Sequence, residues 1–156
     1  MPKASNRRIN LATQLRSLQQ LFESNDGARI ELDLGEYSKI MVYADKEQLQ
    51  RAFINLVKNG IQSIPEGREG RISIRLEVDS DLLVRVSFAD NGKGIPEEIR
   101  DKLFRPNFTT KSAGMGMGLA ISHNVIRSLG GRIWYETVLD QGTTFYVELP
   151  ISEDKT

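Results

Sequence analysis

The chain has 156 residues, with 21 Lys and Arg against 21 Asp and Glu, so no net charge draws it toward nucleic acid. It has no cysteine and a single histidine, which excludes disulfides and thiolate chemistry and argues against a zinc site. No apolar run reaches the roughly 18 residues of a membrane span, and the length fits one domain with a sizeable core.

The first part of the chain predicts one helix and two short strands. Segment 1–9 is polar and is expected to form an N-terminal tail. An amphipathic helix is expected to begin near Asn10, because apolar side chains recur every three or four positions from there to Phe22. Alternation of apolar and polar residues in 28–35 and 39–45 then indicates two strands.

A longer helix and a hairpin follow. Asp45 is a suitable N-cap for a helix over 46–64. Pro65 and Gly67 end this helix. Alternation through most of 71–90 predicts an antiparallel hairpin with one buried face.

The longer helix carries three amide side chains on one face. Asn55 and Asn59 are four positions apart, and Gln62 lies close to the same line. By themselves these amides have two interpretations, a solvated polar face or a set of amide oxygens that bind a hard cation. Magnesium takes oxygen ligands, commonly few of them from protein and the rest from phosphate and water.

The hairpin ends in the stretch "FADNGKGIP", where Asp90 follows Phe88 by two positions. The alternation therefore turns the Asp90 carboxylate to the apolar side of the strand. A buried carboxylate without a partner costs several kcal/mol, so a basic side chain or a ligand is expected to face it. The simpler alternative is a turn residue, because Asp-Asn-Gly is a favourable turn sequence.

A glycine-rich stretch precedes the last expected helix, which covers 119–129. Gly114, Gly116 and Gly118 let the backbone come close to an anion, and free amides at a helix N-terminus attract phosphate. Lys111 adds a positive charge just upstream. A flexible loop is the alternative, and the stretch lacks the Lys-Ser/Thr ending of a Walker loop.

The remaining segments complete the predicted fold. Pro96 opens a helical segment over 96–104, and two strands joined around Gly142 are expected within 132–150. These elements predict an α+β fold, an α/β two-layer sandwich with about five strands in a mixed, largely antiparallel sheet and helices packed on one face. The expected domain spans 10–150, followed by a polar tail over 151–156.

Four motifs occur in order: an asparagine box "NLVKNGIQSI", a glycine box "DNGKGI", a phenylalanine box "LFRPNFTTK" and a second glycine box "GMGMGLAIS". With the closing segment "GGRIWYETVLDQGTTFYVELP", they make the chain from about Asn10 to Pro150 resemble the catalytic, ATP-binding domain of sensor histidine kinases. This family belongs to the gyrase, chaperone, kinase and MutL superfamily, and the resemblance implies its Bergerat ATP-binding fold. The short spacing from Phe108 to Gly114, together with Gln62, is similar to the nitrogen-regulation-type branch with a short lid.

The resemblance also implies a site for ATP and Mg²⁺. Asp90 would accept a hydrogen bond from the adenine amino group, Asn59 would hold Mg²⁺ against the phosphates, and Asn55 would assist. Thr110 or Lys111 would approach the γ-phosphate, so these two and the two asparagines are the implied catalytic residues. The full set implied for nucleotide and metal binding is Asn55, Asn59, Gln62, Asp90, Gly92, Gly94, Ile95, Phe104, Phe108, Thr110, Lys111, Gly114, Met115, Gly116, Met117, Gly118, Leu119 and Thr143.

Some positions depart from the family's pattern. Gly60 stands where alanine is usual, which lowers helix propensity by about 1 kcal/mol. Arg105 and Asn107 stand where an acid and an aromatic residue are common, which would alter how the lid docks. Relatives that hydrolyse ATP use a glutamate where this chain has Asn55, and an amide cannot act as a general base. His123 lacks the neighbours of a phosphoacceptor motif and is expected to have a packing or surface role.

We therefore expect the catalytic fragment of a protein-histidine kinase. It would bind Mg-ATP and transfer the γ-phosphoryl group to a histidine on a dimerisation domain upstream of this chain. A response regulator receiver domain would be the downstream partner, with no nucleic acid and no membrane contact by this domain, which is expected in the cytoplasm. The alternatives are a nucleotide-binding regulatory module without transfer activity, and an ATP-hydrolysing or serine-kinase relative.

Overall fold

The computed structural model describes residues 5–23, 27–80, 82–105 and 118–152. Its elements in chain order are β1 (Arg7–Asn10), α1 (Leu11–Leu21), β2 (Arg29–Asp33), β3 (Met41–Ala44), α2 (Lys46–Gln62), β4 (Arg71–Ser80), β5 (Leu83–Asp90), the 3₁₀ helix η1 (Glu97–Lys102), α3 (Gly118–Ser128), β6 (Arg132–Val138) and β7 (Gly142–Pro150).

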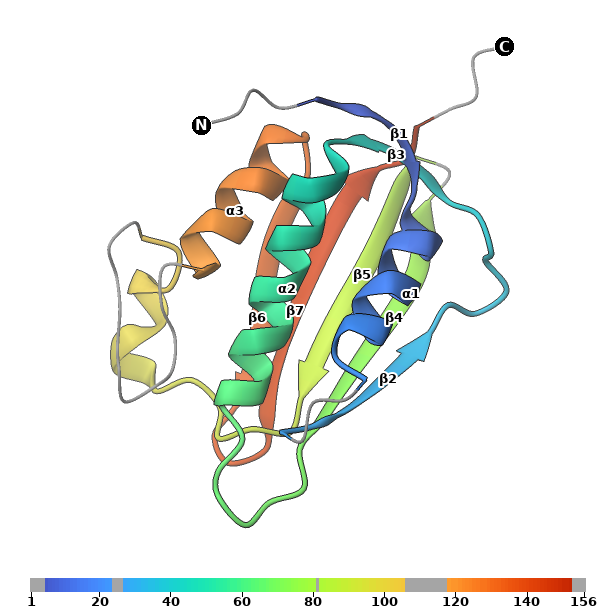
Figure 1. The fold of residues 1–156 in the computed structure, drawn as a ribbon. Coiled ribbons are helices and arrows are strands. Elements are labelled where there is room, and N and C mark those ends of the chain that lie inside the picture. The colour runs from blue at the N-terminus through green and yellow to red at the C-terminus, as the bar shows by residue number, and fades with distance from the viewer. Residues whose placement is uncertain (1–4, 24–26, 81, 106–117, 153–156) are drawn as a thin grey trace.

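The main sheet has five strands in the order β2-β4-β5-β7-β6. β2 runs parallel to β4, and the remaining neighbours in this sheet are antiparallel. Figure 1 shows α1, α2 and α3 on the same face of the sheet. The predicted mixed, largely antiparallel sheet with helices on one face is confirmed.

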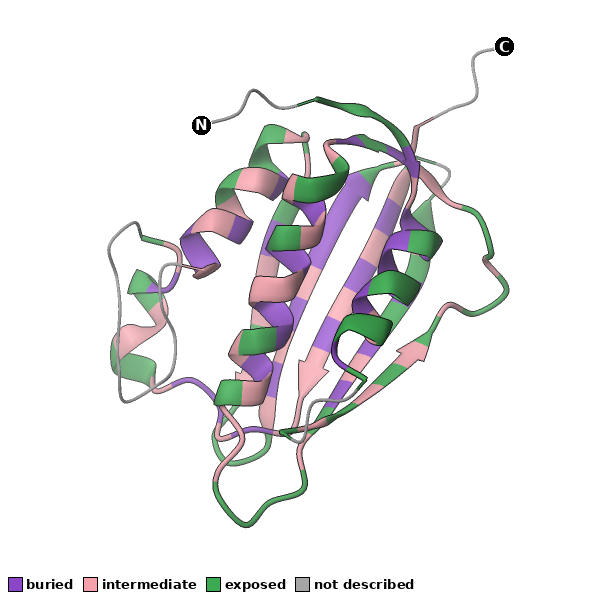
Figure 2. Cartoon of the chain, viewed as in Figure 1, coloured by how far each residue is buried: buried purple, intermediate pink, exposed green. Residues whose placement is uncertain are grey.

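The core lies between this sheet and the helices. Alternate residues of β4, β5 and β7 are buried on the helix side, as the purple bands in Figure 2 show. Phe53 of α2 is fully buried and packs against Phe88 of β5, with ring centroids 5.3 Å apart. Fully burying a side chain of this size contributes about 1.5–3 kcal/mol, so such contacts hold α2 on the centre of the sheet.

Capping side chains set the starts of the first two helices. Asp45 Oδ1 accepts hydrogen bonds from the backbone N–H groups of Glu47 and Gln48 at 3.0 and 3.1 Å, which confirms the predicted N-cap of α2. Asn10 Oδ1 accepts from the Ala12 N–H at 3.1 Å and caps α1. Because these bonds satisfy N–H groups that lack partners inside the helix, both helices begin where the sequence predicts.

A two-stranded sheet is a feature that the sequence analysis did not anticipate. β1 lies partly within the segment expected to be a tail, and it pairs antiparallel with β3. Ile9 faces Val42 across this pair, and both side chains are buried. Four residues are too few for alternation to be recognised in the sequence, so this strand depends on its partner.

Two further details differ from the expectations. Leu82, expected to continue the buried face of the hairpin, is 63% exposed, because it lies in the turn before β5, which begins at Leu83. The segment after Pro96 forms the 3₁₀ helix η1, without a hydrogen bond from a capping side chain. Such short segments commonly adopt the tighter 3₁₀ geometry. In the described part of the chain, every helix is too short or too polar to span a bilayer.

Candidate functional site

Asp90 is the last residue of β5, and its neighbour across the hairpin is the buried Ile72. Its side chain is half-buried below the C-terminal part of α2. Asp90 Oδ1 accepts hydrogen bonds from the Gly92 N–H at 2.9 Å and the Thr143 N–H at 3.1 Å. The carboxylate therefore points to the helix side of the sheet, as the alternation predicts, and backbone donors from two segments hold it there.

Burial raises the pKa of the Asp90 carboxyl group above its ordinary value of 3.8. The backbone bonds from Gly92 and Thr143 and the nearby Ser63 hydroxyl lower this pKa, but the loss of solvation outweighs them. No positive side chain among the described residues contributes to the shift. In the described part of the chain this carboxylate therefore has no ionic partner, which favours binding of a ligand donor to it.

Gly60 brings the helix into close contact with Asp90. A Cβ atom at Gly60 would lie 2.7 Å from Ile72 Cδ1, 3.2 Å from Asp90 Cβ and 3.5 Å from Asp90 Oδ2. This glycine therefore does more than lower helix propensity, because the absent side chain allows α2 to approach the end of β5.

The loop 90–94 turns sharply beneath this helix end. A Cβ atom at Gly92 would collide with the Ser63 side chain. Gly94 has φ +78°, and a Cβ there would lie 2.7 Å from the Val138 carbonyl oxygen. Only glycine fits such a position without strain. The next residue, Ile95, is buried, and its N–H donates to Thr137 Oγ1 at 3.0 Å.

The three amide residues of α2 have different environments. Asn59 Nδ2 is buried and has no hydrogen-bond partner among the described residues. Asn55 Nδ2 donates to the Gly118 carbonyl oxygen at 3.4 Å, a long bond that joins α2 to the start of α3. Gln62 is exposed. The structure thus places Asn55 against the start of α3 and buries the amide nitrogen of Asn59, whereas Gln62 is exposed.

The start of α3 is packed against α2. Leu119 is buried, and a Cβ atom at Gly118 would lie 3.1 Å from the Asn55 amide carbon. One turn later, the buried Ser122 hydroxyl donates to the Ala52 carbonyl oxygen at 2.8 Å. These contacts fix the helix that follows the glycine-rich stretch relative to the amides of α2.

Phe104 belongs to an aromatic cluster beside α3. Its ring stacks on His123, with centroids 5.1 Å apart, and packs edge-on against Phe145 at 6.4 Å. The Tyr135 ring completes the cluster at 6.2 Å from Phe104. His123 is half-buried, so the packing role expected for it is consistent with this contact.

Several predicted site residues lie outside the described residues. They come from the phenylalanine box and the second glycine box, and they are Phe108, Thr110, Lys111, Gly114, Met115, Gly116 and Met117. Their proposed contacts with a ligand stay predictions.

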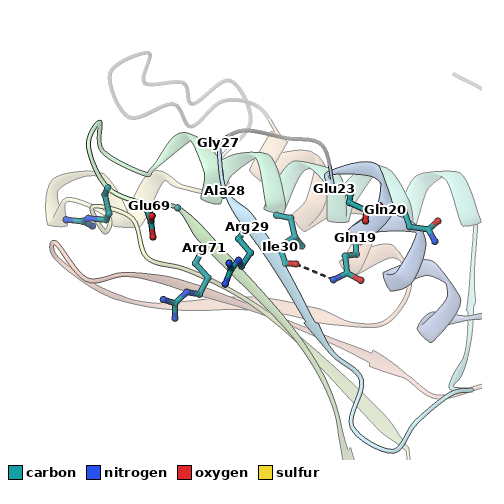
Figure 3. A pocket seen from close by; sticks show the side chains of 11 residues that line it. Gln19, Gln20, Glu23, Gly27, Ala28, Arg29, Ile30, Glu69 and Arg71 are labelled. Atoms are coloured by element: carbon teal, nitrogen blue, oxygen red, sulfur yellow. Dashed lines mark hydrogen bonds between the residues drawn. The ribbon is translucent and has the colours of Figure 1, made fainter.

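A described hollow of about 950 Å³ lies elsewhere, beside the end of α1 and the starts of β2 and β4. Figure 3 shows its side chains spread around an open space. The Gln19 amide donates to the Ile30 carbonyl oxygen there at 3.2 Å. Arg71 extends at the opposite end from Gln20. Because these polar groups do not converge on one point, the hollow is not a candidate catalytic site.

Sequence reasoning missed four residues that support loop 90–94. Thr137 and Ser63 contact it from β6 and from the end of α2. Arg68 and Asn91 join it to the segment before β4. The available signal was the turn at Gly67, which directs the chain back toward the loop. The sequence does not show that loop 90–94 is the partner of this turn, because the two segments are far apart in the chain.

Comparisons with a family model, with curated proteins and with solved structures indicate the same family. The family described as histidine kinase-, DNA gyrase B- and HSP90-like ATPase matches residues 44–153. Sensor protein FixL of Bradyrhizobium diazoefficiens is 33% identical over 132 residues, which are 85% of this chain but only 26% of FixL. A nucleotide-free structure of the catalytic domain of histidine kinase ThkA has 35% identity and a TM-score of 0.80, covering 94% of this chain and 97% of that one.

A further structure shows ThkA in complex with the response regulator protein TrrA. It has 32% identity and a TM-score of 0.78, with 98% of this chain and 44% of that chain covered. The chain described above thus spans about a quarter of the length of FixL, and it corresponds to nearly the whole of the solved ThkA catalytic domain.

Proposed function

Because the chain belongs to the family of histidine kinase-, DNA gyrase B- and HSP90-like ATPases, we propose that it is the ATP-binding catalytic domain of a sensor histidine kinase. The observation that carries this proposal is the Asp90 carboxylate, which is half-buried, has no ionic partner among the described residues and is held by two backbone N–H groups. A ligand with an amino group at the edge of a flat ring fits this environment, and adenine is such a ligand.

In this proposal, the base lies between α2 and loop 90–94. The exocyclic amino group of adenine donates to Asp90, while Gly92 and Gly94 let the backbone turn under the ring. Ile95 and Leu119 contribute apolar surface, and the Thr143 N–H keeps the carboxylate oriented. The close approach of α2 at Gly60 supports this placement, because it brings the end of the helix next to the Asp90 carboxylate.

The residues present also fit a magnesium ion. The Asn59 amide oxygen is a ligand type that Mg²⁺ accepts. The buried Nδ2 of the same amide has no partner among the described residues and suits a phosphate oxygen as acceptor. The described residues contain no cluster of three or more His, Cys, Asp or Glu side chains for a metal. This suits Mg²⁺, which usually takes most of its ligands from phosphates and water. Asn59 would hold the ion, with Asn55 as the second contact, and the ion would neutralise phosphate charge.

The side chain that α2 carries at position 55 favours phosphoryl transfer over ATP hydrolysis. In this proposal, Asn55 stands at the position where a general base would be needed to activate water, and an amide cannot take that proton. The nucleophile is therefore proposed to be an imidazole nitrogen of a histidine on a separate dimerisation domain. Its bond to the γ-phosphorus forms as the bond from that phosphorus to the β,γ-bridging oxygen breaks, and ADP leaves. Positioning and charge neutralisation supply the catalysis.

The partners follow from the same reaction. The proposed donor of the acceptor histidine is the dimerisation domain of the longer protein, and the phosphoryl group would pass from it to a response regulator, in the cytoplasm. Thr110, Lys111 and the glycines at 114, 116 and 118 are proposed to contact the phosphates.

Labelled ATP tests this function. With Mg²⁺, the domain alone should neither label itself nor release phosphate appreciably. Supplying a histidine-bearing helical hairpin, tethered to the domain, should give acid-labile label on the hairpin. Weaker labelling by a separately added hairpin is expected, because tethering removes most of the association penalty. Robust phosphate release by the domain alone would refute the kinase assignment in favour of an ATPase. Stable label on His123 would show that the acceptor lies in this chain.

A further inference from the structure

The segment 63–70, which connects α2 to β4, runs beside loop 90–94. Pro65 and Arg68 close a turn through a hydrogen bond from the Arg68 N–H to the Pro65 carbonyl oxygen at 3.2 Å. Gly67 has φ +84° in this turn, as type II geometry requires, and open space surrounds the position of its missing Cβ. The turn therefore directs the Arg68 side chain back toward the loop.

Arg68 bonds to the backbone immediately after Asp90. Its Nη1 donates to the Asn91 carbonyl oxygen at 2.8 Å and to the Gly92 carbonyl oxygen at 3.1 Å. Hydrogen bonds from a charged guanidinium are stronger than neutral ones, and one nitrogen here joins two successive peptide units. These units include the Gly92 N–H that binds the Asp90 carboxylate.

The Asn91 side chain extends the same connection. Its Oδ1 accepts from the Arg71 N–H at 2.8 Å, and its Nδ2 donates to the Glu69 carbonyl oxygen at 2.8 Å. The Lys93 N–H donates to the Ser63 carbonyl oxygen at 3.0 Å. Segment 63–70 and the first residue of β4 thus bind the loop on its outer side, opposite the contacts from Thr137 and Thr143.

We propose that Arg68 is a positioning residue for the adenine subsite. Its guanidinium holds loop 90–94 in the conformation that presents the Asp90 carboxylate and the Gly92 backbone to the base. This inference rests on the proposed function, and it adds a residue that lies in none of the four motifs. Arg68 itself does not touch the nucleotide in this proposal.

The location of Arg68 makes it possible to distinguish a positioning role from a role in folding. Its side chain is exposed, lines the open hollow beside the end of α1, and adds nothing to the buried core. Water can therefore replace the guanidinium at both carbonyl groups when the side chain is removed. Truncation is expected to loosen the loop locally and to leave the cooperative unfolding of the domain unchanged.

The experiment compares Arg68→Ala, Arg68→Lys and Arg75→Ala by calorimetric titration with ADP. Arg75 is a matched control, an exposed arginine on β4 whose partner is Glu77 at 3.0 Å. Arg68→Ala should bind ADP about three- to tenfold more weakly, Arg68→Lys should recover part of the loss, and Arg75→Ala should match the unsubstituted protein. Amide hydrogen exchange of loop 90–94 should rise in Arg68→Ala at an unchanged melting temperature.

A double-mutant cycle with Asp90→Ala makes the test specific. If Arg68 acts through the Asp90 carboxylate, removing Arg68 from the Asp90→Ala variant should cost much less affinity than removing it from the unsubstituted protein. Equal losses in both backgrounds, or no loss in either, would overturn the positioning role. Absence of ADP binding by the unsubstituted domain would instead refute the proposed function.

Discussion

The two sides of the proposed nucleotide site are built in opposite ways. On one side, loop 90–94 and Asp90 are held by backbone donors and by close packing at Gly60 and Gly92. On the other side, the amide face of α2 has a buried Asn59 nitrogen without a partner among the described residues and a long bond from Asn55.

This difference indicates that the two sides acquire their geometry at different moments. The subsite for the base is arranged by folding itself, because its polar groups already have protein partners. The proposed subsite for metal and phosphates is incomplete among the described residues, because the buried amide nitrogen of Asn59 has no partner there, and we propose that a ligand supplies one. Substitutions on the first side should therefore weaken the binding of every adenine nucleotide. Substitutions on the second side should weaken binding only when metal and phosphates are present.

The largest effect is expected from Asp90→Ala. The substitution removes a charged acceptor worth about 1.5–3 kcal/mol, so ADP affinity should fall about ten- to a hundredfold. Calorimetric titration with ADP in the presence and absence of Mg²⁺ should show the same loss in both conditions, because the base subsite is independent of the metal. An ADP affinity equal to that of the unsubstituted protein would reduce Asp90 to a turn residue.

Asn59→Ala should give the next largest effect, with the opposite dependence on metal. Removing the amide should abolish most of the gain in ATP affinity that Mg²⁺ confers, about tenfold if one ligand is lost. Titration in excess chelator should change much less. Lys58→Gln is a suitable control, because Lys58 is exposed on the same helix and lies outside the predicted set of site residues. Equal losses with and without metal would point to a damaged helix and would remove the contrast between the two sides.

Gly60→Ala tests the contact between α2 and the end of β5, where the two sides of the proposed site meet. The new Cβ would press on Asp90 Cβ and on the flexible end of Ile72, while alanine gains about 1 kcal/mol of helix propensity. We expect a few-fold loss of ADP affinity with little change in thermal stability, since the two effects on stability offset each other. A variant that binds ADP normally would show that the close approach of α2 does not matter for the base.

The smallest effect concerns stability without ligand. Because burial raises the folded-state pKa of Asp90 above 3.8, the folded state binds more protons than the unfolded state between the two values. The contribution of Asp90 to stability is therefore present at low pH and is lost as pH rises through the folded pKa.

Asp90→Asn removes this charge and keeps an oxygen acceptor for the Gly92 and Thr143 N–H groups. Melting temperatures of the ligand-free protein should be higher for Asp90→Asn at neutral pH, and the difference should shrink as pH falls below the ordinary carboxyl value of 3.8. ADP binding at neutral pH should be weaker. A constant difference at all pH values would mean that the carboxylate is not destabilised by burial.

Local patterns predicted most of the fold. Alternation in β4 and β5 and the cap at Asp45 placed these elements correctly, because both depend on neighbours within a few residues. The same alternation oriented Asp90, since side chains of a strand alternate between its faces. β1 was missed, because a four-residue pairing depends on the partner strand. The exposure of Leu82 was missed, because alternation does not show where the hairpin turn ends and β5 begins.

By itself, the sequence determined the order of elements, the face on which Asp90 lies and the set of amides on α2. The tertiary structure alone decided that Arg68 bonds to Asn91, 23 positions away, and that the Thr143 N–H meets Asp90 across 53 positions. The apolar periodicity of a segment and its helix or strand propensity indicate which of its residues face the core and which face solvent. Which groups from distant segments meet depends on the path of the backbone between them, and that path is set only when the sheet and helices pack together.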